Sequence, residues 1–327
     1  MEYRALGRTG LRVSVLGLGC GGFGGIGSAP ELFGRGEDKE TAFALMNHAW
    51  DAGINYFDTA DSYGGGASER MIGAWLKERN VRDRLILSTK VLYALEEGPQ
   101  DRSLSRRHIM EAVDGSLRRL QTDHIDLYVT MEPDPATPIE ETLQTMNDLM
   151  QAGKVGHIGA SKITAPQLRD SLTASDRMGV HRYQSVQNGY SLLDRAIEAE
   201  LLPLAARERI AVTPFSPAAG GLLTGKYRFG DRPPQGSRVD LRPQPYRHLM
   251  NSGTFHAIDA LRATAAERGV NMSALALAWV ISHPAVTSAL IGPRTVEQFR
   301  PWLEAVEIHL TKDEREAVAS RMETAAV

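Results

Sequence analysis

The sequence predicts an α/β protein, a (β/α)8 TIM barrel preceded by an N-terminal β-hairpin. Short apolar runs typical of buried parallel strands alternate with helical patterns, eight such strands are each followed by a helix, and no Ser- or Pro-rich linker divides the 327 residues. A doubly wound sheet is the competing architecture, but its first glycine-rich turn should lead directly into a helix. Here the glycine-rich segment 19–27 continues as a loop to residue 37. We therefore expect residues 1–327 to form one barrel domain.

The order of the elements follows from turn and capping signals. Two short strands, 3–6 and 11–13, flank a Gly-Arg-Thr-Gly turn and predict the hairpin. Asp38 is placed to begin the first helix and Gly53 to end it. The predicted barrel strands are 13–18, 54–58, 85–89, 125–130, 155–161, 185–187, 210–215 and 287–291, and the predicted helices are 39–51, 68–79, 105–120, 138–151, one opened by Thr164 with Pro166 in its first turn, 197–207, 254–268, 273–282, 295–305 and 311–324.

Two long segments, 19–37 and 227–251, have no readable secondary structure. The glycines of the first predict either a loop that lies against a flat ligand, through Gly21 and Gly22, or a plain flexible turn. The second is long enough to be functional or disordered. Its arginines could clamp a phosphate or an anionic substrate, or form a solvated charged surface; they are Arg228, Arg232, Arg238, Arg242 and Arg247.

Composition and charge exclude several function classes. The net charge of -3 and the pI of about 6.3 give no field that favours nucleic acid or an anionic membrane. Cys20 is the only cysteine, which excludes an intramolecular disulfide and fits a reducing compartment. The N-terminus carries charges where a signal peptide needs an apolar segment, and no run approaches the roughly 18 apolar residues of a membrane span. We expect a cytoplasmic protein that acts on a small molecule, with no metal site; its oligomeric state is not readable.

Three residues at the ends of two successive strands predict a catalytic site. Asp58 and Tyr63 follow strand 54–58, and Lys90 follows strand 85–89, so their side chains converge if these strands are neighbours. An ammonium group stabilises a phenolate, and a carboxylate would hold that ammonium in place, so the three groups could pass a proton to or from a substrate oxygen. In the alternative interpretation all three residues are structural. Asp58 would cap a turn, Tyr63 would pack in its loop, and Lys90 would form a salt bridge at the end of its strand.

Several motifs, spread over nearly the whole chain, closely resemble the aldo-keto reductase superfamily, in particular its bacterial and potassium-channel β-subunit-like branches. The resemblance implies a barrel that binds NADPH without a Rossmann domain and reduces carbonyl compounds, with Asp58, Tyr63 and Lys90 as three members of the family's catalytic tetrad. The motifs are Phe-Asp-Thr-Ala-Asp-Ser-Tyr-Gly at 57–64, Asp-Leu-Tyr at 126–128 with Pro-Asp-Pro at 133–135, Gly-Ala-Ser at 159–161, Tyr-Ser-Leu-Leu-Asp at 190–194, Ser-Pro at 216–217 and Gly-Leu-Leu-Thr-Gly-Lys-Tyr at 221–227.

The fourth member of the tetrad departs from the pattern. The family usually has histidine where alignment places Met131, and a thioether can neither donate a hydrogen bond to a substrate oxygen nor share a proton with Tyr63. Glu132 is one place further along the strand, where the period of two would point it to the other face unless the strand bulges.

The resemblance also implies the cofactor residues. Ser161 and Gln187 match the positions that hold the nicotinamide carboxamide, while Lys162 replaces the family's asparagine. Phe215 matches the aromatic position that stacks on nicotinamide. Arg294 matches the site of the adenosine 2'-phosphate, so the preference for NADPH over NADH rests mainly on it; a surface cation is its alternative role. Further implied positions are Gly21, Gly22, Ser216, Pro217, Gly221, Leu222, Thr224, Lys226, Gly292, Thr295 and Gln298.

The sequence therefore predicts an NADP(H)-dependent oxidoreductase that interconverts a carbonyl and an alcohol, with Tyr63 as the general acid and base. NADH is not excluded as the cofactor. Three alternatives remain open: a C=C reductase of enones, a sugar-alcohol dehydrogenase, and a nucleotide-binding regulator or sensor of low turnover. The sequence does not identify the substrate.

Overall fold

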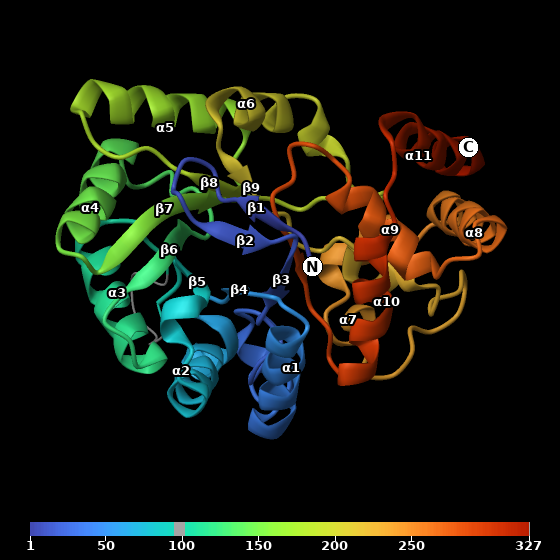
Figure 1. The fold of residues 1–327 in the computed structure, drawn as a ribbon, viewed down its shortest axis with the longest axis horizontal. Helices are drawn as coiled ribbons and strands as arrows, with labels where there is room; N and C mark the ends of the chain where they lie inside the picture. Colours follow the sequence, from blue (N-terminus) through green and yellow to red (C-terminus); the bar gives the residue numbers. More distant parts are fainter. Residues whose placement is uncertain (95–101, 327) are drawn as a thin grey trace.

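Eight parallel strands form the centre of the fold. The computed structural model describes residues 1–94 and 102–326, and its strands follow one another in the order β10-β3-β4-β5-β6-β7-β8-β9 (Figure 1). Between the two ends of that series, Leu290 N–H donates to Pro214 O at 2.8 Å and Phe215 bridges to Leu290, which closes the barrel. The predicted barrel is confirmed. The strands are β3 Leu16–Gly19, β4 Tyr56–Asp58, β5 Ile86–Val91, β6 Ile125–Thr130, β7 Val155–Ser161, β8 Ser185–Gln187, β9 Ala211–Val212 and β10 Ala289–Ile291.

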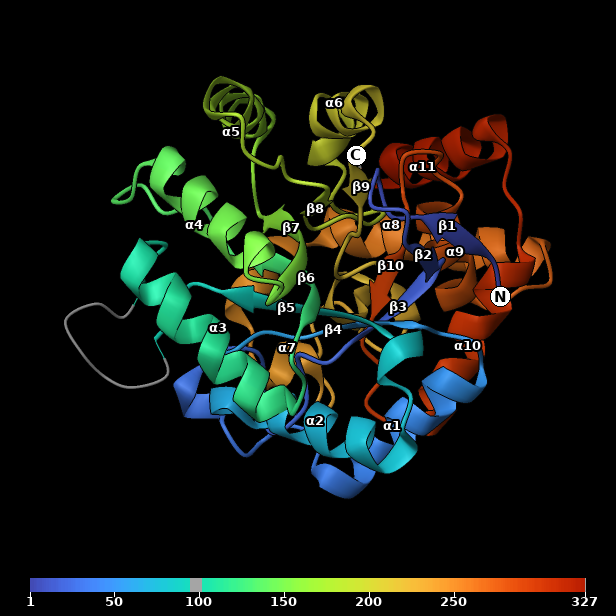
Figure 2. The same ribbon diagram turned by 60° about the vertical axis from the view of Figure 1, so that its left-hand side comes forward.

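Helices surround the strands as an outer layer, in the order expected of a (β/α)8 barrel (Figures 1 and 2). Asp38 accepts a hydrogen bond from Thr41 N–H at 2.9 Å, and Thr164 forms a capping box with Gln167, so both predicted helix starts are confirmed. The helices are α1 Lys39–Asp51, α2 Ala67–Arg79, α3 Arg106–Leu120, α4 Ile139–Gln151, α5 Ala165–Met178, α6 Leu201–Glu208, α7 Arg238–Leu241, α8 Ser252–Glu267, α9 Met272–Ile281, α10 Phe299–Glu304 and α11 Lys312–Ala326.

Two of the predicted barrel strands differ most from the structure, each for a local reason. The predicted strand 13–18 is divided, since residues up to Ser14 pair with the hairpin and β3 begins only at Leu16. The Ser14 hydroxyl donates to Leu16 O at 2.6 Å across the break. The predicted strand 210–215 is regular only at Ala211–Val212, because Pro214 has no N–H group to continue the ladder.

The N-terminal hairpin covers one mouth of the barrel. Strands β1 Tyr3–Ala5 and β2 Arg12–Ser14 are antiparallel, as predicted. Gly7, in the turn, has φ +58°, and a Cβ there would lie 2.6 Å from Gln184 O, so the turn is packed against the start of a barrel strand. Hairpin side chains share one buried cluster with interior side chains of the barrel: Leu6, Val13, Tyr56, Leu127, Val129, Ala211 and Leu290.

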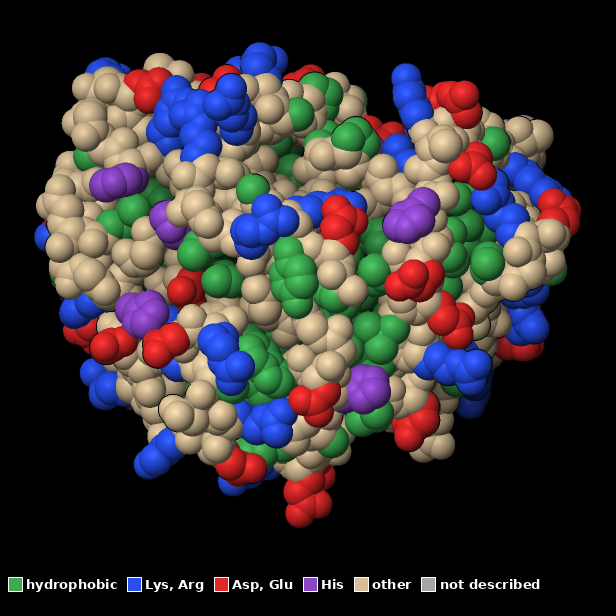
Figure 3. Space-filling model, in the orientation of Figure 1, with side chains coloured by type: hydrophobic (Ala, Val, Ile, Leu, Met, Phe, Trp, Pro, Cys, Tyr) green, Lys and Arg blue, Asp and Glu red, His purple; other side chains and the backbone are tan. Residues whose placement is uncertain are grey.

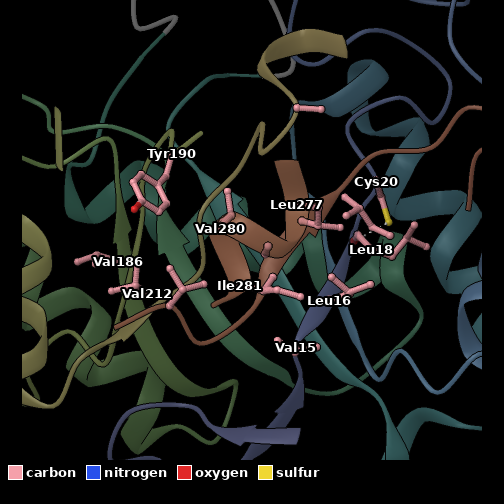
Figure 4. Packing of buried hydrophobic residues seen from close by; sticks show 14 of the residues in the cluster. Val15, Leu16, Leu18, Cys20, Val186, Tyr190, Val212, Leu277, Val280 and Ile281 are labelled. Atoms are coloured by element: carbon pink, nitrogen blue, oxygen red, sulfur yellow. Dashed lines mark hydrogen bonds between the residues drawn. The ribbon is translucent and has the colours of Figure 1, made fainter. Parts of the chain in front are cut away.

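A larger core lies between the strands and the helices. Figure 4 shows Leu277, Val280 and Ile281 of α9 pointing toward side chains of β3 and β9. Acidic and basic side chains are interspersed over the face seen in Figure 3. Within the described residues, no helix combines the length and the apolar character that crossing a membrane requires.

The two segments without readable structure are folded loops. Segment 19–37 folds back on itself, since Glu37 N–H donates to Gly22 O and Gly24 N–H donates to Glu37 O, both at 2.8 Å. Gly36 is required there, because a Cβ would lie 2.0 Å from Gly22 O. The first loop also contains a 3-10 turn, Pro30–Leu32, and the second contains α7 and a 3-10 helix, Gln244–Leu249.

Candidate functional site

A cavity of about 630 Å3 opens at the carboxyl ends of the strands. Its volume is typical of a small-molecule or cofactor site. Strand ends, the 19–37 loop and the 227–251 loop all contribute to its wall. Bare glycine backbone, aromatic rings and charged side chains line it, including Gly21, Gly22, Gly27, Gly189, Gly220, Gly221, Gly292, Tyr63, Tyr93, Phe215, Trp302, Asp58, Lys90, Lys226, Arg238, Arg242 and Arg294.

Asp58 and Lys90 form a buried ion pair at the base of this cavity. Asp58 ends β4 beside Ser88 of β5, and Lys90 lies two residues further along β5, on the same face. Lys90 Nζ donates to Asp58 Oδ2 at 2.5 Å and to Thr59 O at 2.8 Å. Ser88 Oγ and Gln187 Nε2 donate to Asp58 Oδ1 at 3.1 and 2.9 Å, so the buried carboxylate is fully hydrogen-bonded.

The ammonium form of Lys90 is favoured in this setting. The Lys90 side chain is 1% exposed and that of Asp58 is 4% exposed. Burial alone would lower the pKa of Lys90, but the charge of Asp58 and the neighbouring Tyr63 hydroxyl together raise it above its ordinary value. Lys90 therefore holds a fixed positive charge next to the cavity.

Tyr63 lies beside this charge, on the 3-10 turn that follows β4. Lys90 Nζ is 5.0 Å from the centroid of the Tyr63 ring. Gly21 lies against the same ring, because a Cβ on Gly21 would be 3.4 Å from Tyr63 Cε2. The structure thus brings the three predicted catalytic residues together at one end of the cavity.

Met131 lines the cavity at the same end, directly after β6. Its side chain is 5% exposed, and its Sδ atom is 4.0 Å from Ser28 Oγ, which in turn lies 2.7 Å from Ser62 Oγ. Glu132 is not part of the cavity wall. Its carboxylate is bound instead by Lys162 and by the Tyr93 hydroxyl. The wall beside Tyr63 therefore has a thioether where a proton-carrying side chain was expected from the resemblance.

Cations gather at another part of the cavity, around a single carboxylate. Arg294 Nε lies 2.6 Å from Glu37 Oε1, and Arg294 Nη1 donates to Gly236 O at 2.5 Å. Lys226 and Arg238 also line the cavity there. Burial, followed by the charges of Arg294 and Arg238, lowers the pKa of Lys226. This concentration of positive charge is suited to a phosphate group.

Most of the predicted site residues line the cavity, but two do not. Leu222 is fully buried in the core, and Thr295 precedes a 3-10 turn on the outside. The structure places the others in the wall: Asp58, Tyr63, Lys90, Met131, Gly21, Gly22, Ser161, Lys162, Gln187, Phe215, Ser216, Pro217, Gly221, Thr224, Lys226, Gly292, Arg294 and Gln298.

Sequence reasoning missed several residues of the wall, above all Glu37, Tyr93 and Trp302. Tyr93 had a readable signal, since it follows Lys90 by three residues at the same strand end. Trp302 also had a signal, since it is an aromatic residue four places after Gln298, one of the implied cofactor positions. Glu37 had no local signal, because its partner Arg294 is 257 residues away. Of the five arginines of the second loop, Arg238 and Arg242 reach the cavity.

Comparison with known proteins identifies the family. The sequence profile of the Aldo/keto reductase family matches residues 15–322. The chain is 38% identical over 325 residues to the "Uncharacterized oxidoreductase YrpG" of Bacillus subtilis (strain 168), covering 96% of this chain and 93% of that protein. It is 35% identical over 314 residues to a "Probable voltage-gated potassium channel subunit beta" of Oryza sativa subsp. japonica (94% and 92% covered), and 33% identical over 339 residues to the "Versiconal hemiacetal acetate reductase" of Aspergillus parasiticus (96% and 95% covered). The match spans the strands, the cavity and the Asp58–Lys90 pair, and the chain belongs to the aldo/keto reductase family.

Proposed function

We propose that this protein is an NADP(H)-dependent oxidoreductase that interconverts a carbonyl and an alcohol, with Tyr63 as the general acid and base. The observation that carries the proposal is the buried Asp58–Lys90 ion pair beside Tyr63 at the base of a large cavity. A buried charge pair is costly to form, and such pairs next to a titratable residue in a cleft are typical of catalytic sites. The single cysteine also favours a reducing, cytoplasmic location.

The residues of the cavity are suited to a nicotinamide dinucleotide. Gly292 leaves open space, since a Cβ there would meet nothing closer than Gly19 O at 3.9 Å. Phe215 and Trp302 supply aromatic surfaces, and Lys226, Arg238 and Arg294 supply charge for phosphates. Bound there, the cofactor would supply or accept the hydride of the reaction.

Each residue of the buried group has a distinct task in this proposal. Tyr63 donates a proton to the carbonyl oxygen during reduction and removes one from the alcohol during oxidation. Lys90 stabilises the phenolate that forms when Tyr63 gives up its proton. Asp58 keeps the ammonium of Lys90 charged and fixed in position. Met131 excludes water from the wall beside Tyr63 but moves no proton.

The Met131 wall supports two alternatives. An apolar wall could seat a conjugated enone or a sugar alcohol, so C=C reduction or alcohol oxidation would use the same site. The second alternative is a regulator or sensor of low turnover, because Met131 gives Tyr63 no proton-carrying partner on this wall. One relative is named as a probable voltage-gated potassium channel subunit, so similar proteins include one named for its place in a channel and not for a reaction.

Tyr63→Phe tests the proposal, since phenylalanine keeps the ring and removes only the transferable proton. We expect turnover with NADPH and a panel of aldehydes, enones and sugar alcohols to fall by about 100-fold or more, with cofactor affinity unchanged. Tyr3→Phe, on the hairpin, is the control. Equal losses of cofactor affinity and turnover would contradict the role of Tyr63. Tight cofactor binding by the wild type, without turnover on any of these compounds, would support the sensor instead.

A further inference from the structure

Glu37 lies in the cavity wall among Lys226, Arg238 and Arg294, and it is paired with Arg294. Its side chain is 4% exposed, while that of Arg294 is 38% exposed. The two residues come from distant parts of the chain, the end of the 19–37 loop and the segment after β10. Arg294 is also the residue on which a preference for the 2'-phosphate of NADPH would depend.

The loop backbone fixes the position of the Glu37 carboxylate. Glu37 N–H donates to Gly22 O and Glu37 O accepts from Gly24 N–H, both at 2.8 Å. Gly22 leaves room for the carboxylate, because a Cβ at that position would lie 2.0 Å from Glu37 Oε2. The side chain is therefore built into the wall and is not a surface group that happens to meet an arginine.

Burial and the neighbouring charges act in opposite directions on the pKa of Glu37, and the net effect is a pKa above its ordinary value. Burial raises the pKa of Glu37, and the hydrogen bond and charge of Arg294 oppose this rise. Arg238 contributes further positive charge. A negative phosphate brought to Arg294 would have to displace this carboxylate or lie close beside it.

We infer that Glu37 is a specificity residue for the cofactor, and that its carboxylate lowers the preference for NADPH over NADH by competing with the 2'-phosphate for Arg294. This inference rests on the proposed function. A phosphate and a carboxylate near each other repel, whereas the 2'-hydroxyl of NADH has no charge and can donate a hydrogen bond to a carboxylate. Arg294 alone would favour NADPH, and the Glu37–Arg294 pair lowers the ratio of NADPH affinity to NADH affinity.

Glu37→Gln tests this inference directly. The dissociation constants of NADPH and NADH are measured by quenching of tryptophan fluorescence and by titration calorimetry, with 2',5'-ADP and 5'-ADP as fragments that carry or lack the 2'-phosphate. We expect the ratio of NADPH affinity to NADH affinity to rise by about tenfold. Glu31→Gln is the matched control, because it removes the same charge from an exposed position of the same loop.

A second variant shows whether the change in affinity comes from the loss of the charge or from a loss of the fold. Glu37→Met removes the charge while keeping a similar volume, a replacement that buried ionic groups commonly tolerate. Both variants should shift the ratio in the same direction, with thermal unfolding as a check that the fold is retained. A ratio that stays at the wild-type value in a folded variant, or an equal change for both dinucleotides, would overturn the inference. Failure of the wild type to bind either dinucleotide would instead refute the proposed function.

Discussion

Replacing Asp58 by asparagine removes one partner of the buried ion pair and tests what that pair contributes. The substitution keeps Oδ1, and with it the hydrogen bonds from Ser88 and Gln187, but it presents an NH2 group to Lys90 Nζ. Lys90 would retain Thr59 O as an acceptor at 2.8 Å. The Lys90 side chain is only 1% exposed, and its buried positive charge would lose its counter-ion.

The expected loss of stability follows from the burial of this ion pair. Breaking a buried pair by removing one partner costs about 3 kcal/mol or more of the free energy of unfolding. At roughly 2 °C per kcal/mol for a chain of this length, the Tm should fall by about 6 °C. Turnover should fall as well, since Lys90 would lose the charge that keeps its ammonium in place.

The pH dependence provides a second measurement on the same variant. Because the pKa of Lys90 is raised above 10.5 in the folded protein, the pair contributes stability that is fully present below pH 10.5 and is lost as the pH rises through the raised value. The stability of the wild type should therefore decrease above that pH, and the variant should show a smaller decrease.

Asp51→Asn is the matched control, since Asp51 forms an exposed pair with Arg79. An exposed pair contributes about 0–1 kcal/mol, so its loss should change the Tm by no more than about 2 °C. If the Tm of Asp58→Asn matched that of this control, the reasoning about the buried pair would be refuted.

Two further substitutions test the proposed roles of the two parts of the cavity, the one around Tyr63 and the one around Arg294. Met131→His places a proton-carrying side chain beside Tyr63 and should raise the rate of simple aldehyde reduction about tenfold or more, measured by NADPH consumption; an unchanged rate would show that Met131 lies away from the chemistry. Arg294→Ala should weaken NADPH binding by about tenfold or more and NADH binding much less, measured by titration calorimetry, and a parallel loss would argue against a 2'-phosphate contact. The Arg294→Ala change is best made in the Glu37→Gln variant and compared with that variant alone, so that no buried carboxylate is left without a partner.

The barrel and the end of the cavity that holds Asp58, Tyr63 and Lys90 could be predicted because both depend on local patterns. Parallel strands end at one mouth, so acids and bases just past their ends must converge, and this placed Asp58, Tyr63 and Lys90 correctly relative to one another. The break at Ser14 was not predicted, because an apolar run does not show where a strand changes its pairing partner. Pro214 was a readable signal for the early end of β9.

The part of the cavity around Arg294 was harder to predict because it depends on contacts between distant segments. Arg294 was singled out correctly as a cation of the wall, but its pairing with Glu37 depends on how the glycine-rich loop folds back over the strands. The conformation of this loop is fixed by backbone hydrogen bonds, such as the one from Gly24 N–H to Glu37 O, and no pattern of side chains predicts them. Leu222, one of the cofactor positions implied by the resemblance, has its side chain buried in the core.

The hairpin at the N-terminal mouth has a consequence for how protons reach the buried pair. Leu6 and Val13 share one buried apolar cluster with inner side chains of the barrel, so the hairpin covers this mouth with packed apolar side chains. The cavity at the opposite mouth is lined by Asp58, Lys90 and Tyr63, so we expect this pair to exchange protons with the solvent through that mouth, past Tyr63. A ligand that fills the cavity would cover this mouth and separate the Lys90 ammonium group from the solvent.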